Sequence, residues 1–229
     1  EGHSSSVFDV RFSPDGKTLA TSSRDNTVKL WQLDGSLVTT LEGHSSSVFD
    51  VRFSPDGKTL ATSSRDNTVK LWQLDGSLVT TLEGHSSSVF DVRFSPDGKT
   101  LATASIDGTA KLWQLDGSLI TTFEAHSSTI RDMRFSPDGK TLATASIDGT
   151  AKLWQLDGSL ITTLEGHSAA VQDVRFSPDG KTLATTSSDG TAKLWPLSLD
   201  VLVAHTCQNM KGYLLSSPNV QLDDKELCN

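Results

Sequence analysis

Residues 1–41 of the chain are EGHSSSVFDVRFSPDGKTLATSSRDNTVKLWQLDGSLVTTL, and residues 42–82 repeat this stretch letter for letter. The same unit returns with few changes from Glu83, Glu124 and Glu165. A period near 40 residues is typical of repeat architectures, in which each unit packs on the next. The 229 residues therefore divide into five units and a remainder: 1–41, 42–82, 83–123, 124–164, 165–198 and 199–229.

Each unit predicts four short strands joined by tight turns. Apolar and polar residues alternate over 7–12, as they do in a strand with one buried face. Ser-Pro-Asp-Gly at 13–16, Arg-Asp-Asn at 24–26 and Asp-Gly at 34–35 are turn sequences. The segments that they bound, 19–23, 27–33 and 37–41, are rich in β-forming residues. One unit is therefore expected to be a four-stranded antiparallel meander.

A single meander is too thin to bury both of its faces, whereas five in series bury them by packing face to face. We therefore expect an all-β fold, a β-propeller built of 41-residue four-stranded blades, five in this chain. A flat β-sandwich is the alternative, but it does not account for the strict period.

Composition narrows the classes of function. The net charge of −8 argues against nucleic acid, which binds to basic surfaces. No stretch approaches the roughly 18 apolar residues that span a bilayer, so no membrane partner is expected. The only cysteines, Cys207 and Cys228, lie outside the repeats and fit a reducing compartment, which predicts a cytoplasmic protein; free thiols and a disulfide both remain open. Because no initiator Met is present, we expect a processed or excised piece of a longer protein.

Three motifs recur in each unit: Gly-His near its start, Ser-Pro-Asp-Gly between strands, and Lys-Leu-Trp near its end. Over residues 1–198 they resemble the WD-repeat β-propeller family, in particular bacterial members with near-identical repeats. The Trp-Asp dipeptide of that family is absent, because Gln or Pro follows each Trp. The remainder, 199–229, is similar to C-terminal extensions of bacterial WD-repeat proteins and is expected to be partly helical.

The resemblance implies a structural tetrad of His, Ser or Thr, Asp and Trp in each unit, which ties a turn to the inner strands by hydrogen bonds. The same residue types would suggest a catalytic triad, but a nucleophile and base duplicated in every unit argue against catalysis. The tetrads are expected at His3, Thr21, Asp25 and Trp31; His44, Thr62, Asp66 and Trp72; His85, Thr103, Asp107 and Trp113; His126, Thr144, Asp148 and Trp154; and His167, Thr185, Asp189 and Trp195.

No catalytic, cofactor-binding or metal-binding residue is predicted. Gly16-Lys17-Thr18 looks like the end of a phosphate-binding loop, but Arg11 stands where such a loop needs Gly. No unit has the alternating carboxylates of a calcium loop or the His and Cys spacing of a zinc site. Arg11 with Asp9, and Lys29 with Asp25, are expected to be weak surface or cross-strand pairs.

The five units differ mainly at positions near two loops, and the resemblance places both loops on the rim that WD-repeat proteins use to bind peptides and proteins. Aromatic and Arg side chains dominate interface energetics, so these positions form a candidate binding rim. The alternative is that packing leaves them unconstrained. The candidates are Phe8, Phe49, Phe90, Arg131 and Gln172 beside the first loop, and Arg24, Arg65, Ile106, Ile147 and Ser188 beside the second.

We therefore expect a non-catalytic protein–protein interaction or scaffold propeller, a fragment of a larger bacterial sensor or scaffold protein, with an unidentified protein or peptide partner and no cofactor. The alternative is a recently amplified or engineered repeat protein with no evolved ligand. Since family propellers mostly have seven blades, we expect either further blades upstream or a homo-oligomer, a dimer that completes one larger ring. An enzyme that uses the central channel is the least favoured class, because near-identical repeats do not supply distinct residues on different blades.

Overall fold

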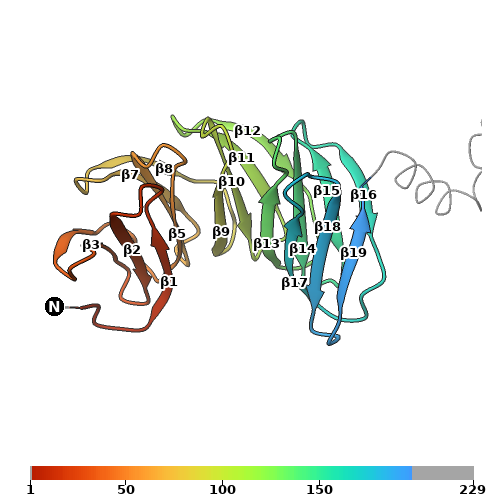
Figure 1. Cartoon of the computed structure of the whole chain (residues 1–229), viewed down its shortest axis with the longest axis horizontal. Coiled ribbons are helices and arrows are strands. Elements are labelled where there is room, and N and C mark those ends of the chain that lie inside the picture. Colours follow the sequence, from red (N-terminus) through yellow and green to blue (C-terminus); the bar gives the residue numbers. More distant parts are fainter. Residues whose placement is uncertain (1, 198–229) are drawn as a thin grey trace, which may run out of the picture.

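Each repeat folds into one antiparallel sheet in which the strands follow one another in chain order (Figure 1). The structure is a computed structural model that describes residues 2–197. These residues form nineteen strands and no helix; four sheets have four strands and the last has three. The all-β prediction of repeated four-stranded antiparallel sheets is thereby confirmed. The remainder at 199–229, with Cys207 and Cys228, lies outside the described residues.

The strands of the first two sheets are β1 (Val7–Phe12), β2 (Thr18–Ser23), β3 (Val28–Gln32), β4 (Leu37–Leu41), β5 (Val48–Phe53), β6 (Thr59–Ser64), β7 (Val69–Gln73) and β8 (Leu78–Leu82). Those of the third and fourth are β9 (Val89–Phe94), β10 (Thr100–Ser105), β11 (Ala110–Gln114), β12 (Leu119–Phe123), β13 (Ile130–Phe135), β14 (Thr141–Ser146), β15 (Ala151–Gln155) and β16 (Leu160–Leu164). The fifth sheet has β17 (Val171–Phe176), β18 (Thr182–Ser187) and β19 (Ala192–Pro196).

The Ser-Pro-Asp-Gly turn shows why the first hairpin closes where the sequence predicts. The Ser13 hydroxyl donates to Asp15 Oδ1 (2.7 Å) and accepts from the Thr18 amide (2.9 Å). Gly16 has φ +70°, a left-handed conformation that side chains disfavour, and its amide donates to the Ser13 carbonyl. Every copy of the turn has the same Gly conformation, so β2 begins at the same place in each unit.

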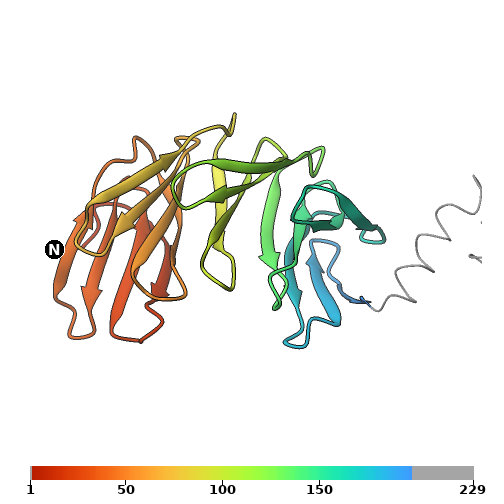
Figure 2. The same ribbon diagram turned by 90° about the horizontal axis from the view of Figure 1, so that it is seen from above.

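The first strands of the sheets lie nearest the axis. β1, β5, β9, β13 and β17 contact one another in succession, whereas the fourth strands face outward. Figures 1 and 2 show the five sheets as a row in chain order, with the first and the last sheet at opposite ends. Residues 2–197 therefore form an arc of blades whose two end faces are separate surfaces.

The core lies between sheets rather than within them. Val28, Leu30 and Leu41 of the first sheet pack against Val51 and other residues of the second. Corresponding clusters fill the other three gaps between neighbouring sheets. Burying one such side chain contributes about 1.5–3 kcal/mol, so each blade depends on its neighbour for stability.

The fourth unit has Ala125 where the others have Gly, and its backbone differs accordingly. Gly43, Gly84 and Gly166 have φ between +143° and +151°. In the described part of the chain, Asn26 and Asn67 are the only residues other than glycine with a positive φ, so Ala125 has an ordinary φ. Its carbonyl accepts a hydrogen bond from Lys152 Nζ (2.7 Å), and the His126 amide donates to the Gly108 carbonyl (3.0 Å).

Candidate functional site

Each unit contains a chain of three hydrogen bonds through the four predicted tetrad residues. In the third unit, Trp113 Nε1 donates to Thr103 Oγ1 (2.9 Å), Thr103 Oγ1 lies 2.8 Å from His85 Nε2, and His85 Nδ1 lies 3.0 Å from Asp107 Oδ2. The same contacts occur in the other four units, with distances from 2.7 to 3.1 Å.

The direction of these bonds follows from the first donor. The indole N–H of Trp113 only donates, so the hydroxyl oxygen of Thr103 accepts it and the hydroxyl proton is free for His85 Nε2. His85 Nδ1–H then donates to Asp107. Burial raises the pKa of Asp107, but hydrogen bonds from His85 and Thr109 outweigh it and hold that pKa well below its ordinary value. At His126, burial lowers the pKa of the imidazole.

This geometry is suited to holding a turn and unsuited to nucleophilic catalysis. Thr103 is fully buried, and its hydroxyl oxygen accepts a hydrogen bond from the Trp113 N–H instead of facing a substrate. Asp107 also accepts from the Ser86 amide and the Thr109 hydroxyl, so it joins the loop before β9 to the turn before β11. The tetrad therefore fastens two loops to the sheet.

The candidate rim residues of the first loop are bulge residues. In the first sheet Val7 pairs with Ser23 and Asp9 with Ser22, which leaves Phe8 outside the ladder. A bulge re-aims the extra side chain and ends the strict alternation of the strand. The same irregularity occurs at the equivalent positions of the other units, Phe49, Phe90, Arg131 and Gln172.

Four of these bulge side chains form a continuous ladder across four blades. The ring centroids of Phe8 and Phe49 are 5.7 Å apart, and those of Phe49 and Phe90 are 4.8 Å apart and stacked. The Arg131 guanidinium lies 5.6 Å from the Phe90 centroid, in cation–π geometry. Phe8 and Arg131 are exposed, and Phe49 and Phe90 are partly exposed. Gln172 does not extend the ladder but donates to Ser188 Oγ (2.7 Å).

The second set of rim residues adjoins the first through the backbone. The amide of Arg24 donates to the carbonyl of Ser6 (2.8 Å), and that of Arg65 donates to Ser47 (2.9 Å). The equivalent bonds start at Ile106, Ile147 and Ser188. The structure thus brings both candidate loops together on one side of the arc, which we call the rim. All five residues of the second set are exposed.

A belt of alternating Asp and Arg side chains, which the sequence did not predict, crosses the blades along the inner strands. Asp91 binds Arg93 of its own strand (2.7 Å) and Arg134 of the next blade (3.4 Å), and its carboxylate also accepts from the Met133 amide (3.1 Å). Equivalent carboxylates join the second blade to the third and the fourth to the fifth. The belt therefore ties each of these blades to its successor.

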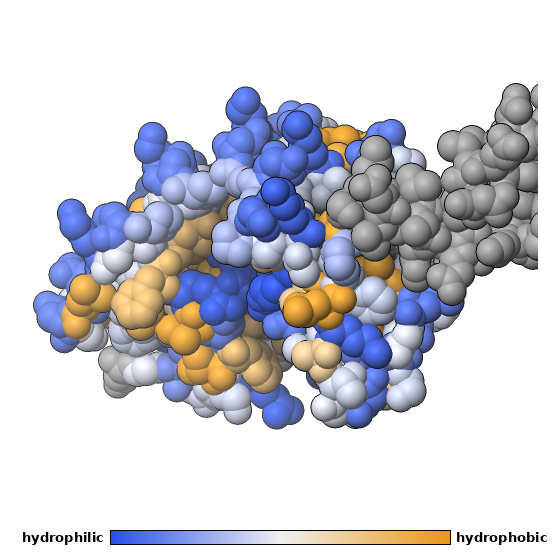
Figure 3. Space-filling view, turned by 45° about the vertical axis from the view of Figure 1, so that its right-hand side comes forward, coloured by the Kyte–Doolittle hydropathy of each residue, from blue (hydrophilic) through white to orange (hydrophobic). Residues whose placement is uncertain are grey.

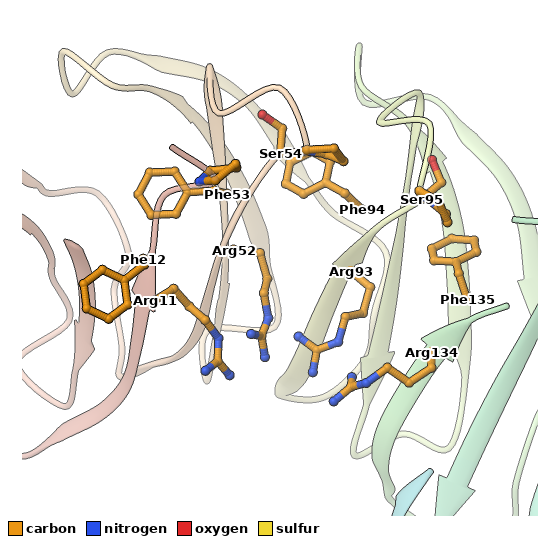
Figure 4. A pocket seen from close by; sticks show the side chains of 13 residues that line it. Arg11, Phe12, Arg52, Phe53, Ser54, Arg93, Phe94, Ser95, Arg134 and Phe135 are labelled. Carbon is orange, nitrogen blue, oxygen red and sulfur yellow. The ribbon is translucent and has the colours of Figure 1, made fainter. Parts of the chain in front are cut away.

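The arginines of the belt also line a pocket of about 370 Å³. Figure 4 shows the guanidinium groups of Arg11, Arg52, Arg93 and Arg134 turned toward the same side, with Phe rings behind them. Burial raises the pKa of Asp91, and Asp132 raises it further, whereas Arg93 and Arg134 oppose this rise. The pocket is thus lined by cations that are already paired with carboxylates.

One of the two predicted ion pairs forms and the other does not. Arg11 binds Asp9 (3.0 Å) with its side chain partly exposed, while the equivalent pair Arg93–Asp91 within β9 is largely buried and Arg93 also reaches Asp50 of the preceding blade (3.2 Å). Lys29 Nζ donates to Thr40 Oγ1 (3.0 Å), while Asp25 is occupied by His3 and Thr27. The sequence signal for the belt was the presence of Asp and Arg two positions apart in the first strand of each unit, because the first strands lie nearest the axis.

Within residues 2–197 no group of three or more His, Cys, Asp or Glu side chains is arranged to hold a metal ion. No helix in this part of the chain is long and apolar enough to cross a membrane. Figure 3 shows hydrophobic side chains on either side of a group of strongly hydrophilic ones on one face of the molecule.

Comparison with protein families agrees with the geometry. The family model described as the IFT122 first beta-propeller matches residues 6–155, and the model described as WD domain, G-beta repeat matches residues 158–196. The first match alone covers more than half of the chain. Propellers of this kind generally serve as protein-interaction scaffolds and are generally not catalysts. The sheets, the tetrads and both matches together show that the chain belongs to the WD-repeat β-propeller family.

Proposed function

We propose that this chain is a non-catalytic scaffold that binds a peptide segment of a protein partner on its rim. The observation that carries the proposal is the ladder of Phe8, Phe49 and Phe90 capped by Arg131. Bulges remove these side chains from the register of backbone hydrogen bonds. Phe49 then stacks on Phe90, and Phe8 lies tilted beside Phe49, all three at least partly exposed. Aromatic residues and Arg are the groups that dominate binding energy at interfaces.

The charge of the rim favours an acidic partner with an apolar anchor. Arg24, Arg65 and Arg131 form no ion pair within residues 2–197, although the chain as a whole carries a net charge of −8. A peptide that inserts an aromatic or aliphatic side chain against the Phe ladder would bring its carboxylates within reach of these cations. The attraction between these exposed charges weakens as the salt concentration rises.

The test uses three fluorescein-labelled 12-residue peptides: one alternating Glu with Phe, one alternating Lys with Phe, and one alternating Glu with Ser. We expect only the Glu/Phe peptide to bind in fluorescence polarisation, and we expect Phe90→Ser to weaken it at least about tenfold. Arg131→Glu should act in the same direction, and Leu119→Ser, at an exposed position on β12, is the control. Binding that ignores Phe90, Arg131 and Gln172 substitutions would remove the rim from consideration.

A second candidate is that the repeats have no evolved ligand and that two copies of the chain complete one ring. It is supported by the identity of residues 1–41 and 42–82 and by the exposed end faces of the arc. It predicts no binding by any of the three peptides. Membership in a larger bacterial sensor, and a cytoplasmic location, remain predictions supported by the resemblance and by the two cysteines.

The Asp–Arg belt along the inner strands does not support the alternative of an enzyme that acts in a central channel. Its Arg and Asp side chains are bound to each other, and the belt repeats the same residues in every blade. We therefore propose that the chain is not an enzyme.

A further inference from the structure

The first sheet exposes on its outer face the residues that every other sheet buries. Val10 is 50% exposed, whereas Val51, Val92, Met133 and Val174, its equivalents, are 0% exposed. Val7 likewise is exposed and its equivalents are fully buried. A pocket of about 380 Å³ lies open on this face, lined by Phe12, Leu19 and Trp31 among others.

The last sheet exposes the opposite half of the same interface. Leu194 is 72% exposed, whereas Leu30, Leu71, Leu112 and Leu153 are between 1 and 3% exposed. Ala192 is exposed, whereas its equivalents Val28, Val69, Ala110 and Ala151 are buried. Each end of the arc therefore presents one side of a contact that the chain makes four times internally.

The polar belt stops at the same two ends. Asp132 accepts from the Val174 amide (3.1 Å) and from Arg175 (2.6 Å) of the following blade. Asp173 is the next carboxylate of the series, and no blade follows it within the described residues. At the other end, Arg11 pairs with no carboxylate except Asp9 within the described residues, and its Nε is buried without a hydrogen-bond partner.

The turns show the same incompleteness. The Cα of each later turn glycine faces the proline of the preceding blade: a Cβ on Gly57 would lie 3.4 Å from Pro14, and one on Gly98 would lie 3.4 Å from Pro55. Gly16, the first of the series, has nothing within 4 Å. Apolar faces, belt and turns thus all end one blade short of a partner on each side.

We propose that a second copy of this chain docks end to end on the first, with its first sheet packed on the last sheet of its neighbour. Asp173 of one copy then accepts from the Val10 amide and the Arg11 guanidinium of the second copy, and Leu194 packs on Val10. The proposal deepens the self-association candidate above and does not depend on peptide binding at the rim. Because the two faces differ, the contact is directional, so copies that use it in succession close a ring where the rotation between them closes and otherwise form an open chain.

The complementarity of the two faces selects this occupant. The sequence of the first unit is identical to that of the second, whose face is already buried by a preceding blade of the same family. The equivalents of the first sheet and of the three described strands of the last sheet already make this contact within the chain. The described part of the last sheet lacks only the fourth strand, and with it the equivalent of Leu41. Other possible occupants, such as residues 198–229 folded onto the last sheet, give different outcomes in the test.

The test uses the 229-residue chain with one face blocked at a time. Val10→Glu places a carboxylate on the first face, and Leu194→Glu places one on the last face; both positions are exposed in the single chain, so the fold is retained. Leu119→Glu, at 50% exposure on the outer strand β12, is the matched control. Molar mass is measured by light scattering over a range of concentrations, and circular dichroism verifies folding.

We expect the wild type and Leu119→Glu to assemble. Each blocked variant alone should stay monomeric at concentrations at which the wild type assembles, because its dissociation constant is at least about tenfold higher. An equimolar mixture of the two blocked variants should form a heterodimer and nothing larger, because one intact contact remains between them. Phe90→Ser should assemble like the wild type, so a failure of rim binding and a failure of assembly are measured separately.

Three results would overturn the proposal. A monomeric wild type would mean that the end faces are covered from within the chain. A Leu194→Glu variant that still dimerises while Val10→Glu does not would indicate a symmetric contact between two first sheets. Assembly that is indifferent to both blocking substitutions would place the contact elsewhere.

Discussion

The tetrad shows what a single residue contributes to this fold. His85 and Thr103 each bond to two other members: His85 Nε2 meets Thr103 and Nδ1 meets Asp107, while Thr103 also accepts from Trp113. The resemblance to the family identified all four positions from the sequence, because each unit repeats them at fixed spacing. What it did not reveal is the second role of Asp107, which also accepts from the backbone of Ser86 and the hydroxyl of Thr109.

Replacing His85 by Ala should therefore destabilise the third blade. The change removes the acceptor of the Thr103 hydroxyl proton and one of the hydrogen bonds to Asp107, both groups of low exposure, and such a loss costs about 1–3 kcal/mol. Urea denaturation should show a lower midpoint, whereas peptide binding at the rim by the folded protein should persist. Ser86→Ala, which removes only a 3.5 Å hydroxyl contact to Asp107, is the control. A midpoint equal to that of the wild type would contradict a stabilising role for the tetrad.

At the scale of the element, small sequence differences between copies alter the backbone. The turn before the third strand has Asn26 and Asn67 in the first two units and Gly108 and Gly149 in the next two, all with φ between +70° and +88°. Asn tolerates this left-handed conformation better than most residues do. The space around the two glycines differs, however, because Ala125 replaces Gly in the loop that packs on the Gly108 turn.

The substitutions Gly108→Asn and Gly149→Asn should therefore have unequal effects. A Cβ on Gly108 would lie 2.4 Å from the His126 carbonyl oxygen, whereas the nearest atom to one on Gly149 is 3.6 Å away. We expect Gly149→Asn to change the thermal midpoint little and Gly108→Asn to lower it by several degrees, about 1–2 kcal/mol for local strain. Adding Ala125→Gly to Gly108→Asn should recover most of the loss. Equal midpoints for the two single variants would show that the His126 carbonyl moves without cost.

The strands themselves were predictable and the bulges were not. The period, the Ser-Pro-Asp-Gly turn and the alternation in 7–12 predicted β1 to β4 to within one residue at each end. Alternation alone puts Phe8 on the same face as Val10, but the bulge removes Phe8 from the ladder and lets it reach Phe49 on the next blade. Contacts between blades 41 residues apart depend on how sheets stack, and one unit of sequence does not contain that information. The Asp–Arg belt was missed for the same reason.

At the scale of the whole molecule, the row of five sheets leaves the end faces as its most incomplete surfaces, and the charge at one end makes their association sensitive to pH. Burial raises the pKa of Asp173 to about 6, and Asp132 adds to the rise, while Arg175 and Arg134 oppose it. In an isolated copy this carboxyl is therefore partly protonated near pH 6. Docking would bury Asp173 and bring Asp9 of the second copy beside it, the kind of environment that raises the pKa of Asp91 within the chain. Association therefore raises the pKa of Asp173 and takes up a proton, although Arg11 opposes the rise.

End-to-end association should then be tightest below about pH 6 and weaken as the pH rises above it. The sign follows from the higher pKa in the docked state, since a group that takes up a proton on binding favours binding at lower pH. Sedimentation of the wild type at several pH values measures the dissociation constant. Asp173→Asn should assemble with a much smaller pH dependence, because no proton is exchanged at this position. Association that tightens as the pH rises above about 6 would mean that Asp173 meets a cation with no carboxylate beside it, and that the second copy docks through a different face.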